Sequence, residues 1–476
     1  MFDSRLAFKI DRRPYCGIDE AGKLIRYGGK RKDRHRKFLG PSGSGKDTSH
    51  LIPCILLTDQ PGAVFDPAAE AFFVTARAKM EQGYEVRLFD PLNVVATIIA
   101  ARPEFSYMAG FTSRGFDPLS RLYGSIPTLG TDCARLAEVL HPMVMGDSQG
   151  VFFTQRSRQL STCLLMHEAI DAEQRRRAPS FERKLDRMSL PHTHPYQDEA
   201  DPNTGQTVPT LQKLMMQLEQ HPYRPMARLA GSFIAANPQV DSVLATAVSN
   251  CQSLLADQQM LDDIKLGASA GRQNPWEDLK HNRIIYYIVL PGEAFETHAV
   301  WLRLVLGDML AVLSQSGGPG EFRPILRINE AGHLGRIEAL RRAVGMIRKN
   351  GVRVDTYWQG LDQVEEIYGA AGSKRFWINA GVKATWATDD PETMLRFSER
   401  AGTKTEDVDS YQTNQQSDNR SRSTHGFRVI NPEAVAGLPD CCTLNFIHGI
   451  EDGNVMELYT PHYSEICKRH DPNPYH

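Results

Sequence analysis

Short, largely apolar runs alternate with longer helical patterns over the first hundred residues. Residues 62–65 and 84–89 have the length and composition of buried strands, and residues 36–39 form the end of a third expected strand. Residues 51–57 and 68–82, which lie between these runs, have the apolar spacing of helices. This alternation predicts a parallel sheet with helices packed against it, which is the architecture of α/β proteins.

The pattern changes between about residues 120 and 270, where strand signals disappear. Here we expect helices over residues 131–144, 152–172, 207–220 and 222–235, continuing through 241–266, with a polar loop at 191–207. We therefore predict an all-α domain inserted into the α/β domain. The predicted boundaries are 1–119 for the N-terminal segment and first part of the α/β domain, 120–271 for the insertion, and 272–476 for the second part with a C-terminal tail.

Strand signals resume after the helical region, and residues 283–290 give the clearest strand pattern in the chain. Further strands are expected at 324–328, 352–358 and 382–388, with a final edge strand at 443–448 and helices at 298–315 and 337–349. Residues 405–425 are polar and rich in Ser, Asn and Gln, which predicts a mobile loop. Residues 1–25 carry no clear pattern.

Composition is that of an ordinary globular protein, with 41% hydrophobic and 24% charged residues among 476. The net charge of −2 gives no global basic field for nucleic acid. Basic residues do gather at positions 26–37, either as a solvated turn before the first strand or as a contact for a phosphate backbone. The eight cysteines form no C-x-x-C pair, and no apolar run is long enough for a membrane span, so we expect a cytoplasmic protein.

A glycine-rich stretch from Gly40 to Asp47 matches seven of the eight positions of the phosphate-binding loop G-x-x-x-x-G-K-[ST]. Glycines suit such a loop because backbone N–H groups must curl around phosphate oxygens, and side chains would block that approach. Lys46 would reach the β and γ phosphates of a nucleotide, and the following helix would point its positive end at them. The candidate nucleotide-binding residues are Gly40, Gly43, Ser44, Gly45, Lys46, Asp47 and Thr48.

A second candidate motif, Asn329-Glu330, follows the predicted strand at 324–328. In phosphate-loop ATPases an acidic pair at a strand end holds Mg²⁺ and polarises the attacking water. Glu330 suits the role of base, but Asn329 is uncharged, and Asp47 stands where a Ser or Thr hydroxyl normally binds Mg²⁺. Either Asp47 supplies the metal-site charge that Asn329 lacks, or both changes mark weakened or lost hydrolysis.

The order of these motifs resembles that of the TraG/TraD-type coupling ATPases of conjugative type IV secretion systems. The resemblance runs from about residue 34 to 462. Beyond the phosphate loop, it rests on Asp66-Pro67-Ala68-Ala69-Glu70, Phe89-Asp90-Pro91-Leu92, Asn329-Glu330-Ala331-Gly332-His333-Leu334-Gly335-Arg336, Gln359 through Tyr368-Gly369, and Ala387-Thr388-Asp389-Asp390-Pro391. The family's Asp-Pro-Lys-Gly-Glu segment lacks its Lys and Gly here.

The resemblance implies a RecA-like phosphate-loop NTPase domain with an inserted all-α domain, assembly into a hexamer, and ATP and Mg²⁺ as cofactors. It also implies DNA, in particular single-stranded DNA, and a relaxase-type substrate as cargo, and inner-membrane secretion components as partners. Lys46 would grip phosphate, Glu330 would activate water, Gln359 would sense the γ-phosphate, and Arg348 would act as an arginine finger on a neighbouring subunit. The family usually has N-terminal membrane helices. Since no such span is seen here, the expected location is peripheral at the inner membrane, reached through a partner or an upstream segment.

Other functions compete with this interpretation. A hydrolysis-deficient member would act as a nucleotide-gated receptor or adaptor. A DNA translocase of the FtsK/HerA type would work on duplex DNA without a secretion partner. A small-molecule phosphate-loop kinase fits less well, because the helical insertion is larger than a kinase lid requires.

Overall fold

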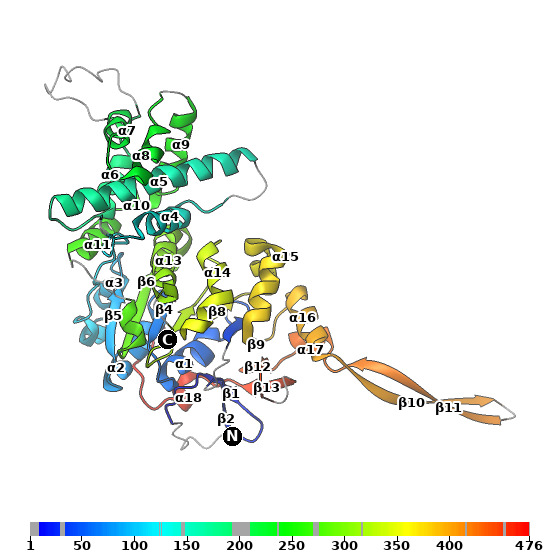
Figure 1. Cartoon of the computed structure of the whole chain (residues 1–476). Coiled ribbons are helices and arrows are strands. Elements are labelled where there is room, and N and C mark those ends of the chain that lie inside the picture. The colour runs from blue at the N-terminus through cyan, green and yellow to red at the C-terminus, as the bar shows by residue number, and fades with distance from the viewer. Residues whose placement is uncertain are drawn as a thin grey trace. The chain divides into compact units, whose positions relative to one another are not determined.

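The computed structural model describes residues 9–28, 34–122, 124, 126–143, 148–192, 210–235, 238–269, 276–315, 318–414, 417–450 and 454–475. The chain divides into two compact units. Unit 1 comprises residues 1–60, 327–332 and 353–471, and unit 2 comprises residues 61–326, 333–352 and 472–476. Figure 1 shows the elements of both units.

Unit 1 is built on a mixed sheet with strands in the order β2-β1-β13-β12-β9-β3-β8. These strands are β1 (Tyr15–Ile18), β2 (Leu24–Arg26), β3 (His35–Leu39), β8 (Arg353–Trp358), β9 (Ala380–Thr385), β12 (Cys442–Ile447) and β13 (Val455–Tyr459). β3 pairs in parallel with both β8 and β9. The helices of this unit are η1 (Lys46–Leu51), α1 (Ile52–Leu57), α15 (Leu361–Asn379), α16 (Pro391–Ala401), α17 (Pro432–Ala436) and α18 (Tyr463–Ile466).

One sequence prediction fails in this sheet, and a segment for which the sequence gives no prediction contributes strands to it. The segment without a clear pattern, residues 1–25, contributes β1 and part of β2, which pair antiparallel with each other. The expected edge strand at 443–448 is β12, which lies between β9 and β13 and is not an edge. The missing prediction and the wrong one have the same cause, because the short strands β1, β2 and β13, of three to five residues, are defined by distant partners rather than by their own pattern.

The predicted mobile loop at 405–425 is also wrong. β10 (Thr403–Asn414) and β11 (Ser417–Arg428) form an antiparallel two-stranded ribbon, with pairs running from Thr403↔Arg428 to Asn414↔Ser417. In Figure 1 the ribbon is joined to α16 and α17. The segment has little hydrophobic alternation, so a pattern search for half-buried strands overlooks it.

Unit 2 contains the parallel strands β4 (Gly62–Pro67), β6 (Ile284–Leu290) and β5 (Glu85–Phe89), in that order. β6 is buried along its whole length, as its apolar sequence predicts. Gly62 is needed because an added Cβ would lie 2.0 Å from the Ile325 carbonyl oxygen. β7 (Ile325–Ile328) then carries the chain into unit 1. The accompanying helices are α2 (Glu70–Glu81), α3 (Val94–Ala101), η2 (Pro103–Met108), η3 (Glu277–Lys280), α12 (Ala294–Thr297), α13 (Ala299–Gln315), α14 (Glu338–Met346) and η4 (Ile347–Asn350).

The described elements between residues 129 and 269 are all α-helices, the type that the sequence predicts there. They are α4 (Leu129–Leu140), α5 (Ser148–Gln174), α6 (Phe181–Met188), α7 (Leu211–Glu219), α8 (Arg224–Gly231), α9 (Pro238–Ser249), α10 (Gln252–Leu255) and α11 (Gln258–Ser269). The helical pattern expected to continue through 241–266 corresponds to parts of three helices, α9, α10 and α11. Residues 193–207 of the predicted polar loop lie outside the described residues, and the proposed domain boundaries stay a prediction.

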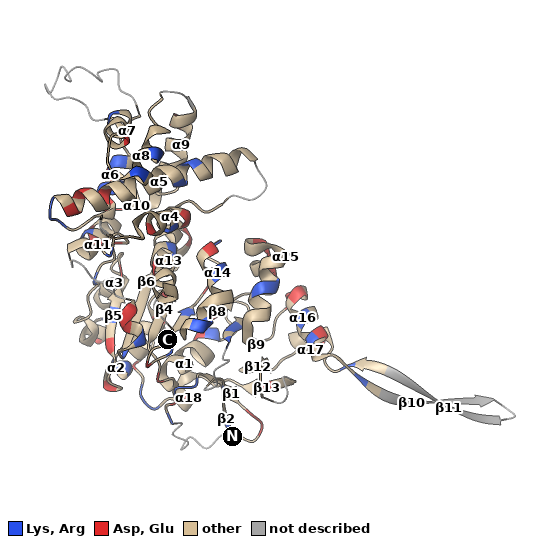
Figure 2. Cartoon of the chain, in the orientation of Figure 1, with Lys and Arg blue, Asp and Glu red and all other residues tan. Residues whose placement is uncertain are grey.

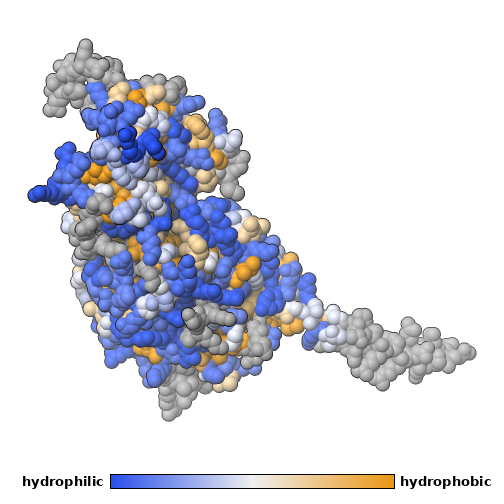
Figure 3. Space-filling model, viewed as in Figure 1, coloured by the Kyte–Doolittle hydropathy of each residue, from blue (hydrophilic) through white to orange (hydrophobic). Residues whose placement is uncertain are grey.

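Charges of both signs are interspersed over the described elements in Figure 2, as the small net charge leads one to expect. On the face drawn in Figure 3, hydrophilic residues cover most of the described surface and hydrophobic residues form small patches. Within the described ranges, no helix combines the length and apolar character needed to cross a bilayer.

The interpretation of residues 26–37 as a solvated turn is wrong for two of its basic residues. Arg36 and Lys37, both on β3, are each 1% exposed. Arg36 donates from Nε to Asp355 Oδ1 at 2.9 Å, from Nη2 to Asp355 Oδ2 at 2.5 Å, and from Nη1 to the Tyr15 carbonyl at 2.7 Å. Burial alone would lower the pKa of Arg36, but Asp355 and Cys54 hold that pKa well above its usual value. Lys30, Arg31 and Lys32 lie outside the described residues.

Lys37 is the second buried cation, and its Nζ has no hydrogen-bond partner among the residues with described positions. Burial, helped by Lys383 and Arg396, lowers its pKa from 10.5 to about 7. Between pH 7 and 10.5 the unfolded chain therefore holds a proton that the folded chain has released, so stability falls as pH drops through this window.

We expect Lys37→Met to raise the free energy of unfolding at pH 7 by about 1–3 kcal/mol, because it removes a desolvated charge. It should also flatten the dependence of stability on pH between about 7 and 10. Urea denaturation across this range measures both effects, with the exposed Lys23→Met as the matched control. An unchanged pH slope in Lys37→Met would contradict the expectation.

Candidate nucleotide-binding site

The glycine-rich loop connects β3 to η1, as the sequence predicts. Gly43 and Gly45 have φ of +78° and +82°, a left-handed conformation that favours glycine. An added Cβ at Gly40 would lie 2.8 Å from Ser44 Oγ and 3.2 Å from the Trp386 ring, so the turn leaves no room for a side chain. These features make a tight cradle of backbone N–H groups of the kind that binds phosphate.

The helical segment after the loop begins before the apolar pattern at 51–57. η1 opens at Lys46, the Ser49 amide donates to the Gly45 carbonyl at 2.8 Å, and α1 follows with Pro53 in its first turn. Asp47 and Thr48 lie in the first turn of η1 and are partly exposed. The positive end of the helix therefore meets the loop, which favours an anion there.

Lys46 folds back into the loop, and its side chain is 4% exposed. Its Nζ donates to the Gly40 carbonyl at 2.6 Å and to the Pro41 carbonyl at 3.2 Å. The same ammonium lies 3.5 Å from Glu330 Oε1. A buried cation is thus held inside the loop and beside the predicted catalytic carboxylate.

Glu330 and Gln359 come together at the ends of two strands. Glu330 follows β7, and Gln359 follows β8. Gln359 Nε2 donates to Glu330 Oε2 at 3.4 Å. Glu330 has φ of +46°, an uncommon conformation for a residue with a side chain. Three of the predicted site residues, Lys46, Glu330 and Gln359, therefore converge.

Asn329 is 3% exposed, and its Oδ1 accepts no hydrogen bond from the described residues. An amide oxygen without a donor is a suitable ligand for Mg²⁺, which prefers oxygen ligands. Asp47 lies in the same unit, at the start of η1. The residues present are chemically compatible with a metal, and the shared role of Asp47 and Asn329 stays a prediction.

Arg348 belongs to η4 in unit 2, where its side chain is exposed. An arginine finger acts on the nucleotide of another subunit, so its proposed role stays a prediction.

The structure adds Trp386, which motif reasoning did not single out. Its amide donates to the Leu39 carbonyl at 3.0 Å, just before the loop, and its ring backs Gly40. Behind the loop, His50 Nδ1 lies 3.0 Å from the Tyr357 hydroxyl and its ring packs 4.1 Å from that of Phe38. Burial holds the pKa of His50 well below its ordinary value, so this support is uncharged. The available signal for Trp386 was its place at the end of an expected strand.

A glycine-rich loop between a strand and a helix, with a lysine beside a strand-end carboxylate, defines the class of phosphate-loop α/β proteins. The sequence profile of the type IV secretory system conjugative DNA transfer family matches residues 10–450, and the chain belongs to this family.

Named relatives agree with this membership. The conjugal transfer protein TraG of Agrobacterium fabrum is 23% identical over 440 residues, covering 90% of this chain and 61% of TraG. The protein VirD4 of the same organism is 23% identical over 442 residues, covering 91% of this chain and 59% of VirD4. The chain thus spans about three fifths of the curated relatives it matches.

A solved structure with a similar fold is that of the plasmid coupling protein TrwB in complex with ADP and Mg²⁺. It has a TM-score of 0.64 at 15% identity and covers 99% of this chain and 93% of TrwB. The unbound monoclinic form of TrwB also has a TM-score of 0.64. These matches confirm the predicted fold class, a RecA-like α/β nucleotide-binding fold combined with an all-α part.

Proposed function

We propose that this protein is a type IV secretion coupling ATPase that binds ATP with Mg²⁺ and helps to deliver conjugative DNA or a DNA–protein substrate. The observation that carries the proposal is the convergence of Lys46, Glu330 and Gln359 at the phosphate loop. Family membership supports it, as do the structures of TrwB in complex with ADP and Mg²⁺ and with non-hydrolysable ATP and GTP analogues.

The residues would act in the following way. The loop amides and the positive end of η1 would bind phosphate oxygens, and Lys46 would exchange its contacts with the Gly40 and Pro41 carbonyls for phosphate. Bound Mg²⁺ would neutralise phosphate charge, with the oxygens of Asn329 and Asp47 as candidate ligands. Glu330 would then orient a water molecule and accept its proton. Gln359, which already donates to Glu330, would fix the direction of that carboxylate.

The finer aspects of the function are inferences from the family resemblance. We infer that the cargo is single-stranded DNA with a relaxase-type protein, and that the working assembly is a homo-hexamer. We also infer that it works at the cytoplasmic side of the inner membrane, next to other secretion components. Arg348, which is exposed, would reach the nucleotide of a neighbouring subunit in such a ring.

A second candidate function is a nucleotide-gated receptor without hydrolysis. Two observations favour it: Asp47 replaces the metal-binding hydroxyl, and Asn329 is uncharged. This candidate shares the phosphate loop with the first and differs from it in turnover alone. The family match favours both over a translocase of the FtsK/HerA type.

Glu330→Gln is expected to keep ATP binding and to lower ATP turnover about 100-fold or more, since an amide cannot accept the proton from water. Turnover would be measured with Mg²⁺ and single-stranded DNA at high protein concentration, and binding by calorimetry. Glu366→Gln, an exposed carboxylate on α15, is the matched control.

The outcomes separate the two candidates. Unchanged turnover in Glu330→Gln would show that another group is the base. Tight ATP binding with no turnover in the unmodified protein would favour the receptor. If the unmodified protein does not bind ATP, both candidate functions are refuted.

A further inference from the structure

A pocket of about 460 Å³ lies within unit 2, and no residue of the phosphate loop lines it. It is formed by α4, α13 and α14, with one side chain from α5. α13 packs against both α4 and α14, so the walls belong to one packed set of helices. The volume is within the range of pockets that hold small organic ligands.

The pocket carries an excess of positive charge. It is lined by six arginines and three carboxylates: Arg121, Arg135, Arg158, Arg303, Arg336 and Arg342, with Glu138, Asp308 and Glu338.

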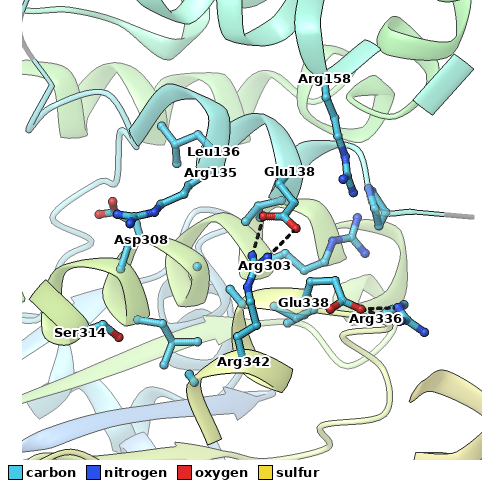
Figure 4. Close-up of a pocket in the computed structure, with 18 of the residues that line it drawn as sticks. Arg135, Leu136, Glu138, Arg158, Arg303, Asp308, Ser314, Arg336, Glu338 and Arg342 are labelled. Carbon is cyan, nitrogen blue, oxygen red and sulfur yellow. Dashed lines mark hydrogen bonds and ion pairs between the residues drawn. The ribbon is translucent and has the colours of Figure 1, made fainter. Parts of the chain in front are cut away.

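The three carboxylates are already engaged by arginines. Arg342 binds Glu138 through two hydrogen bonds of 3.0 and 2.5 Å, as Figure 4 shows. Arg336 Nε donates to Glu338 at 2.7 Å, and Arg121 pairs with Asp308. Outside the lining, Asp132 pairs with Arg135 at 3.2 Å and lies 3.9 Å from Arg121. The six arginines still exceed these four carboxylates by two charges, which an additional anion in the pocket would meet.

Arg158 is the arginine best placed to receive such an anion. It reaches the pocket from α5, and Figure 4 shows its guanidinium group turned toward the same end of the pocket as that of Arg303. Its Nε donates to the His141 carbonyl at 2.7 Å, while its buried Nη2 has no hydrogen-bond partner among the described residues. Burial lowers the pKa of Arg158, and a nearby anion would stabilise its charged form.

Apart from Ser314 and Gln315, the rest of the lining is apolar. It includes Leu136, Val139, Leu310, Ile337 and Met346, and none of the described lining residues is aromatic. Nucleobases are usually held by stacking on aromatic rings, so this wall suits saturated hydrocarbon better than a base. A guanidinium fork, by contrast, matches a carboxylate or a phosphate.

We propose that this pocket is a second ligand site, which binds an organic anion with a carboxylate or phosphate head at Arg158 and an aliphatic body against α4, α13 and α14. The site goes beyond the proposed nucleotide function and does not depend on it. Free small molecules and the headgroup region of a lipid share this chemistry.

The test uses the full chain and isothermal titration calorimetry with octanoate and octyl phosphate, each below its micelle concentration. Octanol lacks the charge, and inorganic phosphate lacks the aliphatic body. We expect both octyl anions to bind more tightly than either of these. Arg158→Met should raise their Kd about tenfold or more, whereas Arg175→Met, at a 70% exposed position directly after the end of α5, should not change it.

Further variants and ligands test the proposal. Ala311→Leu narrows the pocket without removing a charge and should also weaken binding, with thermal melts reporting that each variant is folded. If the calorimetric binding of a phosphate compound is lost in Lys46→Ala and kept in Arg158→Met, that binding belongs to the phosphate loop and the proposal is overturned. Equal binding of octanol, equal binding of inorganic phosphate, displacement by single-stranded DNA, or no binding at millimolar concentration would each overturn it. Anionic vesicles that bind while the free octyl anions do not would assign the site to a membrane surface and overturn the small-ligand assignment.

Discussion

Lys46→Ala is expected to weaken the binding of Mg²⁺–ATP about 100-fold and to remove any ATP turnover. The ammonium group is 4% exposed, and it sits among loop carbonyls that offer no replacement cation. Charge-assisted hydrogen bonds are each worth about 1.5–3 kcal/mol, and about 1.4 kcal/mol corresponds to a tenfold change in Kd. Calorimetry with ATP, or fluorescence with a labelled analogue, would measure the loss.

Two variants make this result specific. Lys374→Ala removes an exposed lysine on α15 in the same unit and should leave the affinity unchanged. Lys46→Arg keeps the charge but replaces a compact ammonium by a larger fork, so we expect an intermediate affinity. Equal ATP affinity in Lys46→Ala and the unmodified protein would show that the loop is not the nucleotide site.

Arg36→Met is expected to lower the free energy of unfolding of unit 1 by about 3–5 kcal/mol, because it leaves the Asp355 carboxylate buried without its partner. Both side chains of this pair are 0% exposed. Replacing both, as Arg36→Met with Asp355→Leu, should recover most of the loss, since no uncompensated charge is then buried. Urea unfolding followed by tryptophan fluorescence would report this, since Trp358 and Trp386 are buried in unit 1.

The exposed pair of Arg13 and Asp11 is the control for this experiment. Its side chains are 51% and 31% exposed, and Arg13→Met should cost no more than about 1 kcal/mol. A loss in Arg36→Met as small as in Arg13→Met would show that the buried pair is not needed for stability. A double variant as unstable as the single one would point instead to the contact between Arg36 and the Tyr15 carbonyl.

The sequence predicted the elements whose own pattern determines their structure. β6 is a continuous apolar run and was clear, and α13 is long and apolar enough to be found within one residue of its observed start. β1 and β13 are short, and they form strands because each pairs with the other in the sheet. The β10–β11 ribbon is polar, so its strand character comes from backbone pairing that composition does not reveal.

The site follows the same division. Lys46 and Glu330 were found because their motifs specify the residue type and spacing, and the structure brings them to 3.5 Å from each other. Trp386 supports the loop by packing of its ring, and no sequence motif identifies a tryptophan at the end of a strand. The excess of positive charge in the pocket could not be predicted from the sequence. Its arginines come from segments that are separated by up to 221 positions in the chain, from Arg121 to Arg342.

Glu330 illustrates a trade-off between folding and chemistry. A side-chain-bearing residue held at a φ of +46° carries backbone strain of about 1–3 kcal/mol, which glycine would relieve at the cost of the carboxylate. Selection for stability alone would therefore drive this position toward glycine, and selection for a carboxylate opposes it. In a laboratory evolution experiment that selects for thermal tolerance alone, position 330 is a place where the chain would gain stability by giving up its reactive group.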